Sequence, residues 1–143
     1  MQLGARRDDV GIACAVGSDV LREFAVSVLR EKGVVMFFQE VESEETSKTL
    51  TLIVEGEDRR FINDPRANQK LSFDHVLGAI KMFRTSMFYV ASGMLGDFDF
   101  RVWELLKFCK ERGMVTMLDI IKPVGKGWGI CSPSAPVCRY HAL

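Results

Sequence analysis

A short polar segment of the sequence gathers side chains that could bind hydroxyl groups. Asn63, Asp64 and Asn68 stand close together around Pro65, between a strand-like run and a helix-like run. Amide and carboxylate groups make the hydrogen bonds that a polyhydroxylated ligand needs. The same residue types also form turns by bonding to the nearby backbone, and that explanation accounts for them about as well. The sequence alone leaves both roles open.

Three further candidates follow apolar runs that have the composition of buried strands. Ser92 and Gly93 come after MFYVA, and Asp119 comes after MVTML. In open α/β sheets, ligands bind at the carboxyl ends of the strands. Ser92, Gly93 and Asp119 are therefore predicted to line a pocket, with a purely structural role equally open.

Metal chemistry is not indicated by the remaining reactive residues. The two histidines are His75 and His141, and the four cysteines (positions 14, 109, 131 and 138) have no Cys-x-x-Cys spacing. A zinc site needs a closer set of ligands than this. We predict no metal site and assign no catalytic residue. Cys14 and Cys109 lie in apolar patterns and are predicted to be buried thiols.

The elements that would position these residues begin with a strand over residues 10–16 and a helix that ends at Gly33. Ser18 can cap the start of this helix, and Asp19, whose charge suits the positive end of the helix dipole, is a second capping candidate. Apolar residues recur in it at helical spacing and predict one buried face: Val20, Leu21, Phe24, Ala25, Val28 and Leu29.

Three short strand-like runs follow, and they predict an antiparallel lid over about residues 34–63. They read VVMFFQEVE, TLTLIVEG and EDRRFIND, and tight polar turns connect them. The alternation in the second run implies one face open to solvent or to a ligand.

Helix and strand patterns then alternate again. The predicted helices read SFDHVLGAIKMF and DFDFRVWELLKFCKERG, and the predicted strands read SMFYVAS and MVTMLDI. This order indicates parallel pairing with right-handed crossovers. The expected fold class is α/β, with a partly parallel, Rossmann-like sheet flanked by helices. After Trp128 the pattern stops, so residues 1–128 are predicted to form one domain and residues 129–143 an irregular tail.

Size and charge narrow the class of protein. The chain has 143 residues, of which 48% are hydrophobic, which is ordinary for one folded domain. The 19 basic residues balance the 19 acidic residues, and this balance argues against a nucleic-acid partner. No apolar run approaches the length of a membrane helix, and the N-terminal sequence has no apolar signal core. We therefore expect a cytoplasmic protein without a membrane partner.

Five segments in this order resemble the ribokinase-like, pfkB-type carbohydrate kinase family over roughly residues 3–128. They are AVGSDVLREFAVSVLREKGV, TSKTLTLIVEGEDRRFI, DPRANQKLS, FYVASGML and VTMLDIIKPVGKGW. The resemblance implies ATP-dependent phosphorylation of a sugar or sugar-acid hydroxyl, with Mg²⁺ as the metal. It also implies that the small β lid closes over the sugar and that Asn63, Asp64 and Asn68 lie on the sugar side.

The sequence departs from the family pattern in two ways. Arg22 and Arg66 stand where the family usually has glycine, which adopts positive φ at little cost. The family's N-terminal strand with its Gly-Gly-Asn segment, and its Gly-Ala-Gly-Asp segment with the anion hole and catalytic Asp, have no counterpart in the sequence.

We therefore expect a truncated kinase relative that keeps part of the sugar side and has lost phosphoryl transfer. The alternative is a non-enzymatic sugar-binding or dimerisation module, which would form homo-oligomers through the lid or through exposed sheet edges. An active kinase completed by a separately encoded half is a third hypothesis.

Overall fold

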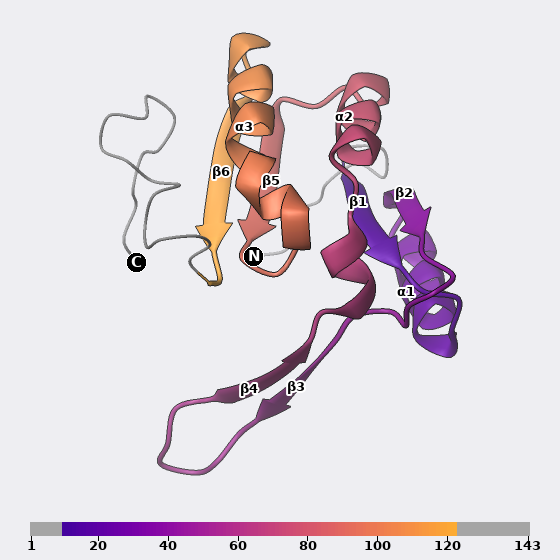
Figure 1. The fold of residues 1–143 in the computed structure, drawn as a ribbon, viewed down its shortest axis with the longest axis vertical. Helices are drawn as coiled ribbons and strands as arrows, with labels where there is room; N and C mark the ends of the chain where they lie inside the picture. Colours follow the sequence, from indigo (N-terminus) through magenta and orange to yellow (C-terminus); the bar gives the residue numbers. More distant parts are fainter. Residues whose placement is uncertain (1–9, 123–143) are drawn as a thin grey trace.

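The computed structural model describes residues 10–122, and Figure 1 shows two strand–helix–strand units with a projecting hairpin between them. The α/β fold class is confirmed. The predicted tail, 129–143, lies outside the described residues. The elements are β1 (Gly11–Val16), α1 (Val20–Glu31), β2 (Val35–Glu40), β3 (Lys48–Leu52), β4 (Arg60–Asp64), the 3-10 helix η1 (Arg66–Lys70), α2 (Phe73–Met82), β5 (Met87–Ser92), the 3-10 helix η2 (Gly96–Arg101), α3 (Val102–Glu111) and β6 (Val115–Ile120).

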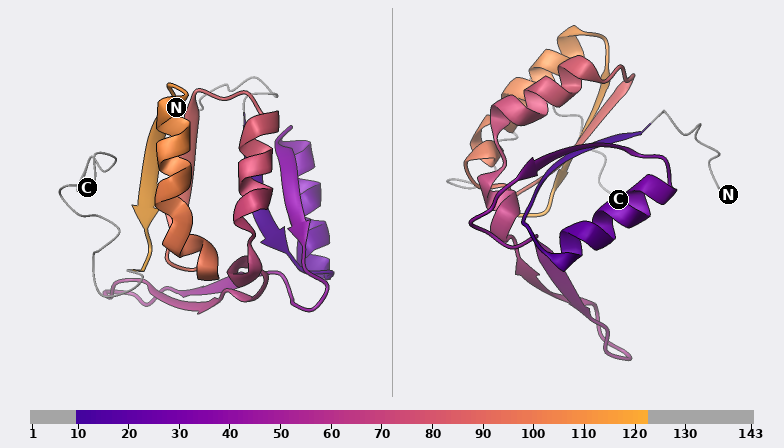
Figure 2. Two further views of the ribbon diagram at one scale, coloured as in Figure 1. Left: turned by 45° about the horizontal axis from the view of Figure 1, so that its top comes forward. Right: turned by 90° about the vertical axis from the view of Figure 1, so that its right-hand side faces the viewer.

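The strands form three separate pairs. β1 pairs with β2 and β5 pairs with β6, both in parallel, and a helix joins the members of each pair. A helical crossover is the usual connection between parallel neighbours. β3 and β4 form an antiparallel hairpin that projects from the end of the molecule where the parallel strands have their carboxyl ends (Figures 1 and 2).

The prediction of three antiparallel lid strands is wrong for the first of them. β2 pairs in parallel with β1, so the projecting lid consists of β3 and β4. The segment VMFFQE begins with four apolar residues in succession, which is typical of a strand buried on both faces. Helix α1 returns this segment to the edge of β1, where it forms a βαβ unit. β2 therefore pairs in parallel with β1 and does not join the antiparallel hairpin.

The core lies under helices α2 and α3, which cover one side of the strands, while α1 lies on the other side (Figure 2). Helix α2 begins as predicted, because the Ser72 hydroxyl accepts a hydrogen bond from the His75 N–H. The buried members of the core cluster are apolar: Ala15, Ala67, Leu71, Val76, Ile80, Val90, Phe98, Val102, Leu105, Leu106 and Cys109.

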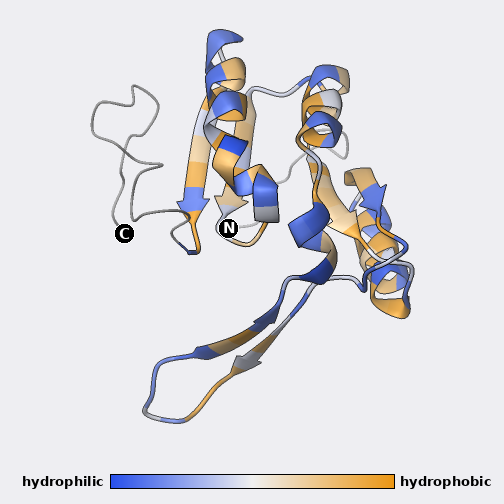
Figure 3. Ribbon diagram, in the orientation of Figure 1, coloured by the Kyte–Doolittle hydropathy of each residue, from blue (hydrophilic) through white to orange (hydrophobic). Residues whose placement is uncertain are grey.

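Of the two capping candidates at the start of helix α1, Asp19 is the N-cap residue. The predicted burial of one face of α1 is not found among residues 10–122. No α1 residue is buried within the described part of the chain, and Val20 and Phe24 are 73% and 68% exposed. The apolar stripe of α1 is therefore uncovered by residues 10–122 (Figure 3). Within the same residues, no helix is long and apolar enough to cross a membrane.

Candidate functional site

The hairpin joins the core at a polar corner that is fixed by backbone contacts. The Ser47 hydroxyl donates to the Pro65 carbonyl (2.5 Å) and accepts from the Asn68 N–H (3.0 Å). The Ala67 N–H donates to the Glu45 carbonyl at 3.1 Å, and Ala67 is fully buried. The two ends of the hairpin are thus clamped together, and η1 is held in place at its root.

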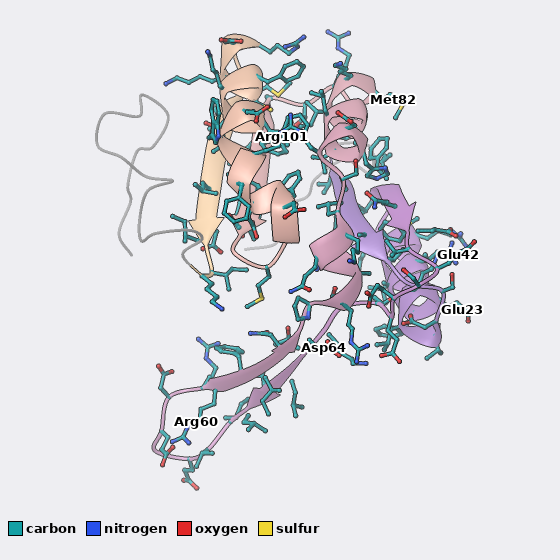
Figure 4. All side chains as sticks on the ribbon, in the orientation of Figure 1. Glu23, Glu42, Arg60, Asp64, Met82 and Arg101 are labelled. Atoms are coloured by element: carbon teal, nitrogen blue, oxygen red, sulfur yellow. The ribbon has the colours of Figure 1, made fainter. Side chains whose placement is uncertain are left out.

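Asp64 lies at this root, whereas Arg60 lies near the far end of the hairpin (Figure 4). The Arg66 Nε–H donates a bifurcated hydrogen bond to the two Asp64 carboxylate oxygens, with N···O distances of 2.9 and 3.1 Å, and the carboxylate lies 3.7 Å from the Lys48 Nζ. Two cations therefore balance its charge at the surface. This arrangement gives Asp64 a local structural role beside its predicted sugar-side role.

Arg66 and Arg22 fit their positions without backbone strain. All described residues with positive φ are glycines, so neither arginine adopts the left-handed conformation that glycine would favour. Arg66 begins η1 and pairs with Asp64, and Arg22 forms an ion pair with Glu40. The conformational penalty expected from these two replacements of glycine is absent.

The side chains of the two asparagines at the corner differ in their hydrogen bonds. Asn63 lies opposite Thr49 in the hairpin ladder, and its Oδ1 accepts a hydrogen bond from the Thr49 hydroxyl at 2.8 Å. The Asn68 side chain is half-buried and makes no hydrogen bond with another residue in 10–122, although its backbone N–H is bound by Ser47. Asn68 therefore offers the freest amide of the corner.

A buried carboxylate shapes the loop after β5. Asp99 is 2% exposed, and its oxygens accept from the Ser92 hydroxyl (2.9 Å), the Gly93 N–H (2.8 Å) and the Leu95 N–H (2.7 Å). Ser92 is itself 1% exposed. The structure thus places Ser92 and Gly93 in a supporting network, with their polar groups turned toward Asp99.

The loop after β5 and the polar corner touch each other directly. Gly96 has a φ of +65°, and a Cβ there would lie 2.2 Å from the carbonyl oxygen of Gln69 in η1. Only glycine permits this approach. The contact brings the two predicted groups together at one end of the molecule, with Asn68 on one side and the Ser92–Gly93 strand end on the other.

Asp119 lies one residue before the end of β6, with an exposed side chain. It accepts a hydrogen bond from the Tyr89 hydroxyl at 3.1 Å. Burial raises the pKa of this hydroxyl, and the Asp119 carboxylate adds to the effect. Asp119 thus stabilises the pair β5–β6 on the face that α3 does not cover.

Sequence reasoning missed two features of this end of the molecule. Asp99 falls within the predicted helix DFDFRVWELLKFCKERG, and no role was predicted for its side chain. Asp19 ties helix α1 to the loop before the hairpin, because it accepts from the Arg22 N–H (3.0 Å), the Thr46 N–H (2.6 Å) and the Thr46 hydroxyl (2.7 Å). These bonds lower the pKa of Asp19. A Ser-Gly pair followed by a nearby Asp is the one sequence signal that pointed toward the Asp99 network.

Residues 10–122 give little support for a metal site or for a nucleophilic cysteine. They contain no group of three or more His, Cys, Asp or Glu side chains that could hold a metal ion. Burial raises the pKa of Cys14 and of Cys109 to about 11, so both thiols are protonated and poorly nucleophilic at neutral pH. A shallow hollow of about 570 Å³ lies along α1, away from the polar corner, and residues between Arg22 and Glu31 line it.

Comparison with solved structures shows the same fold in several kinases. The ribokinase of Giardia lamblia matches with a TM-score of 0.68 and 14% identity, over 80% of this chain and 36% of that one. The adenosine kinase of Anopheles gambiae matches with a TM-score of 0.66 and 17% identity, over 76% and 32%. A putative ribokinase II of E. coli matches with a TM-score of 0.64 and 24% identity, over 78% and 38%. The chain thus spans about a third of each of these structures and has part of the ribokinase-like fold.

Comparison of sequences identifies the family. No match was found among curated proteins. The model of the pfkB family carbohydrate kinases matches residues 2–129, which is most of the chain. On the evidence of this match and of the shared fold, the chain belongs to the pfkB family of carbohydrate kinases.

Proposed function

We propose that residues 10–122 form the sugar side of a carbohydrate kinase site, and that this chain binds a sugar or a related hydroxyl compound without phosphorylating it. The observation that carries the proposal is the polar corner, where Asn68 has a free side-chain amide on a backbone fixed by Ser47. Asn63, Asp64 and Asp119 supply further polar groups at the same end of the molecule. Ser92 and Gly93 belong to this site as supports.

Phosphoryl transfer is left out of the proposed function for a chemical reason. The reaction depends on backbone N–H groups, cations and Mg²⁺ arranged around the transferred group. Residues 10–122 contain no group of three or more His, Cys, Asp or Glu side chains that could hold a metal ion, and the sequence contains no Gly-Ala-Gly-Asp segment. We therefore place neither ATP nor Mg²⁺ on this chain. A cytoplasmic location is part of the proposal, and the free thiols of Cys14 and Cys109 agree with a reducing compartment.

Thermal shift over a panel of pentoses, hexoses, sugar acids and nucleosides tests the binding proposal. We expect at least one compound to raise the Tm, since a ligand that binds the native state stabilises it. Asn68→Ala should abolish the shift, while Gln69→Ala, at the exposed neighbouring position, should keep it. A panel without any shift would contradict sugar binding. ATP consumption in the same wells that depends on the sugar would contradict the loss of transfer.

A second candidate function is dimerisation through the hairpin. Leu50 and Ile62 lie opposite each other in the ladder and are 57% and 58% exposed, so one face of the hairpin is apolar and uncovered by residues 10–122. Light scattering on size-exclusion fractions tests this candidate. Ile62→Lys should convert a dimer to a monomer, whereas Thr51→Lys, on the opposite face, should leave it intact. A chain that is monomeric before any substitution would contradict it.

A further inference from the structure

The junction between η1 and α2 is held by a side chain from a distant strand. Gln39 lies one residue before the end of β2 and 31 residues before Lys70 in the sequence. Its Nε2 donates to the Lys70 carbonyl at 2.7 Å, and its Oε1 accepts from the Ser72 N–H, also at 2.7 Å. One side-chain amide thus bridges the two sides of Leu71.

The backbone groups that Gln39 binds come from a break between two helices. Lys70 contributes the last carbonyl of η1, and Ser72 is the N-cap residue of α2. Leu71 and Ser72 have non-helical ψ values of 123° and 135°, so neither helix continues through the junction. Backbone groups at helix ends lack a partner within their own helix. Gln39 supplies such a partner and thereby fixes the place where the chain passes from one helix to the next.

The same junction is hydrogen-bonded to Asn68. The Leu71 N–H donates to the Asn68 carbonyl at 3.2 Å, which closes the last turn of η1. On the other side, the Asn68 N–H is bound by the Ser47 hydroxyl. Asn68 is therefore held between the hairpin, through Ser47, and strand β2, through Gln39.

Other contacts keep α2 on β2 when the bridge is removed. The His75 Nε2–H donates to the Phe37 carbonyl at 2.8 Å. The Phe37 ring meets the edge of Phe83, which follows α2, with 6.1 Å between the ring centroids. Leu71 is itself buried in the core cluster. The bridge therefore determines the geometry of the η1–α2 junction more than the docking of α2.

We propose that Gln39 is a positioning residue of the sugar site, which sets the orientation of Asn68 without contacting the sugar. The inference rests on the proposed function, in which the side-chain amide of Asn68 binds the sugar. The two polar atoms of Gln39 are directed to the backbone on both sides of Leu71, whereas the Asn68 side chain has no hydrogen-bond partner in residues 10–122. Asn68 thus supplies recognition, and β2 supplies its orientation.

Substitution by glutamate makes the bridge depend on pH. A carboxylate accepts hydrogen bonds but donates none, so in Gln39→Glu it opposes the Lys70 carbonyl at neutral pH. At about pH 4 the protonated carboxyl group donates again and restores the bridge. Gln39→Met removes both hydrogen bonds at every pH and is the second variant.

Nuclear magnetic resonance of the 143-residue chain tests the position of Asn68. The side-chain NH₂ signals of Asn68 are assigned by their loss in Asn68→Ala. They should move in Gln39→Glu at pH 7.5 and coincide with the wild-type signals at pH 4, whereas in Gln39→Met they should move at both pH values. The NH₂ signals of Asn63, in the hairpin, are the internal control and should stay in place. If the Asn68 signals of both variants coincide with those of the wild type at pH 7.5, the proposal fails.

Binding is measured by calorimetry with D-ribose, D-fructose and adenosine as probes. For a probe that binds the wild type, we expect Gln39→Glu to bind at least about tenfold more weakly at pH 7.5 and within about threefold of the wild type at pH 4. Gln69→Glu adds the same charge at an exposed position of η1 and should bind like the wild type at both pH values. Other titratable groups near the junction are common to all these proteins, so comparison at equal pH removes their effect: Glu40, Lys70, Asp74 and His75.

The two measurements separate this proposal from the proposed function. Equal affinity of the wild type and Gln39→Glu at pH 7.5 overturns the role of Gln39 alone. A loss of affinity without movement of the Asn68 signals also overturns it, because Gln39 would then contact the sugar itself. If no probe binds the wild type, the proposed function is contradicted, and the Asn68 signals alone decide whether Gln39 orients Asn68.

Discussion

Single residues with several hydrogen bonds hold together the end of the molecule where the candidate site lies. Asp99 orders the loop after β5, and Asp19 joins helix α1 to the loop before the hairpin. Each carboxylate accepts three hydrogen bonds: those of Asp99 come from one loop, residues 92–95, and those of Asp19 come from α1 and from Thr46. Asp99 and Asp19 can thus position the segments around Asn68 and the strand ends without contacting a ligand themselves.

Asp99→Asn should lower the free energy of unfolding by about 2 kcal/mol. The amide NH₂ would face an N–H or O–H donor, which leaves a buried polar group without a partner. Ser92→Ala, which removes one of the three donors, should cost about 1 kcal/mol. Urea denaturation measures both values. Asp97→Asn, at an exposed position of the same 3-10 helix, is the control, and an equal loss in that variant would contradict the role assigned to Asp99.

Asp19 should make the stability depend on acid pH. Its folded pKa is lowered, so its contribution is present above its ordinary pKa of 3.8 and is lost as the pH falls through the lower folded value. Asn can also cap a helix, so Asp19→Asn keeps the cap and removes the charge. Denaturation at neutral pH should show the variant to be less stable than the wild type, and the difference should shrink below pH 3.8. A difference that does not change with pH would rule out this linkage.

At the scale of elements, the sequence predicted the local patterns and the parallel pairing of β5 with β6, but it did not predict the partner of β2. The sequence correctly predicted that β1, α2, β5 and β6 exist and what type they are, because each has its own periodicity and its own stop signal. The partner of β2 could not be predicted, because an apolar strand can pair with β1 as well as with β3. The crossover through α1 is what places β2 beside β1.

The candidate site was predictable to the same degree. Turn chemistry pointed to Asn63, Asp64 and Asn68, which do lie at one corner. The role of Asp99 was hidden, because a carboxylate at the start of a helix looks the same in sequence whether it faces water or a buried loop. The approach of Gly96 to Gln69 joins segments 27 residues apart, and no local pattern records such a contact.

Gly96→Ala should separate the polar corner from the loop after β5. The new Cβ would lie 2.2 Å from the Gln69 carbonyl oxygen, in addition to the strain of a positive φ. Gly113 also has a positive φ (+76°), but no atom lies within 4 Å of a Cβ there. Gly113→Ala should therefore cost about 1 kcal/mol, the strain alone, and Gly96→Ala clearly more. Equal losses in urea denaturation would mean that the contact contributes nothing.

At the scale of the whole molecule, the described residues leave much apolar surface uncovered. Phe24 on α1 and Met117 on the outer face of β6 are 68% and 50% exposed. Parallel strands are normally covered on both faces. This chain covers only 36% and 32% of two related solved structures, so those structures have further chain to provide such cover. The pattern therefore fits a part of a larger α/β arrangement.

We expect the isolated chain to self-associate as its concentration rises. The formal net charge is zero, so little repulsion opposes the burial of apolar surface between copies. Phe24→Lys should shift the association, measured by sedimentation velocity, to higher concentration. Thr51→Lys adds the same charge away from α1 and should have a smaller effect. A monomer across the whole concentration series would contradict this expectation.

The hairpin β3–β4 has a consequence for how this family changes over time. Nearly all of its residues are exposed, and within residues 10–122 it is joined to the core at the clamp formed by Ser47 and η1. A substitution in the hairpin therefore need not first be compatible with a packed interior. Substitutions can therefore accumulate there without a loss of foldability, so the hairpin is a region where variation is nearly free.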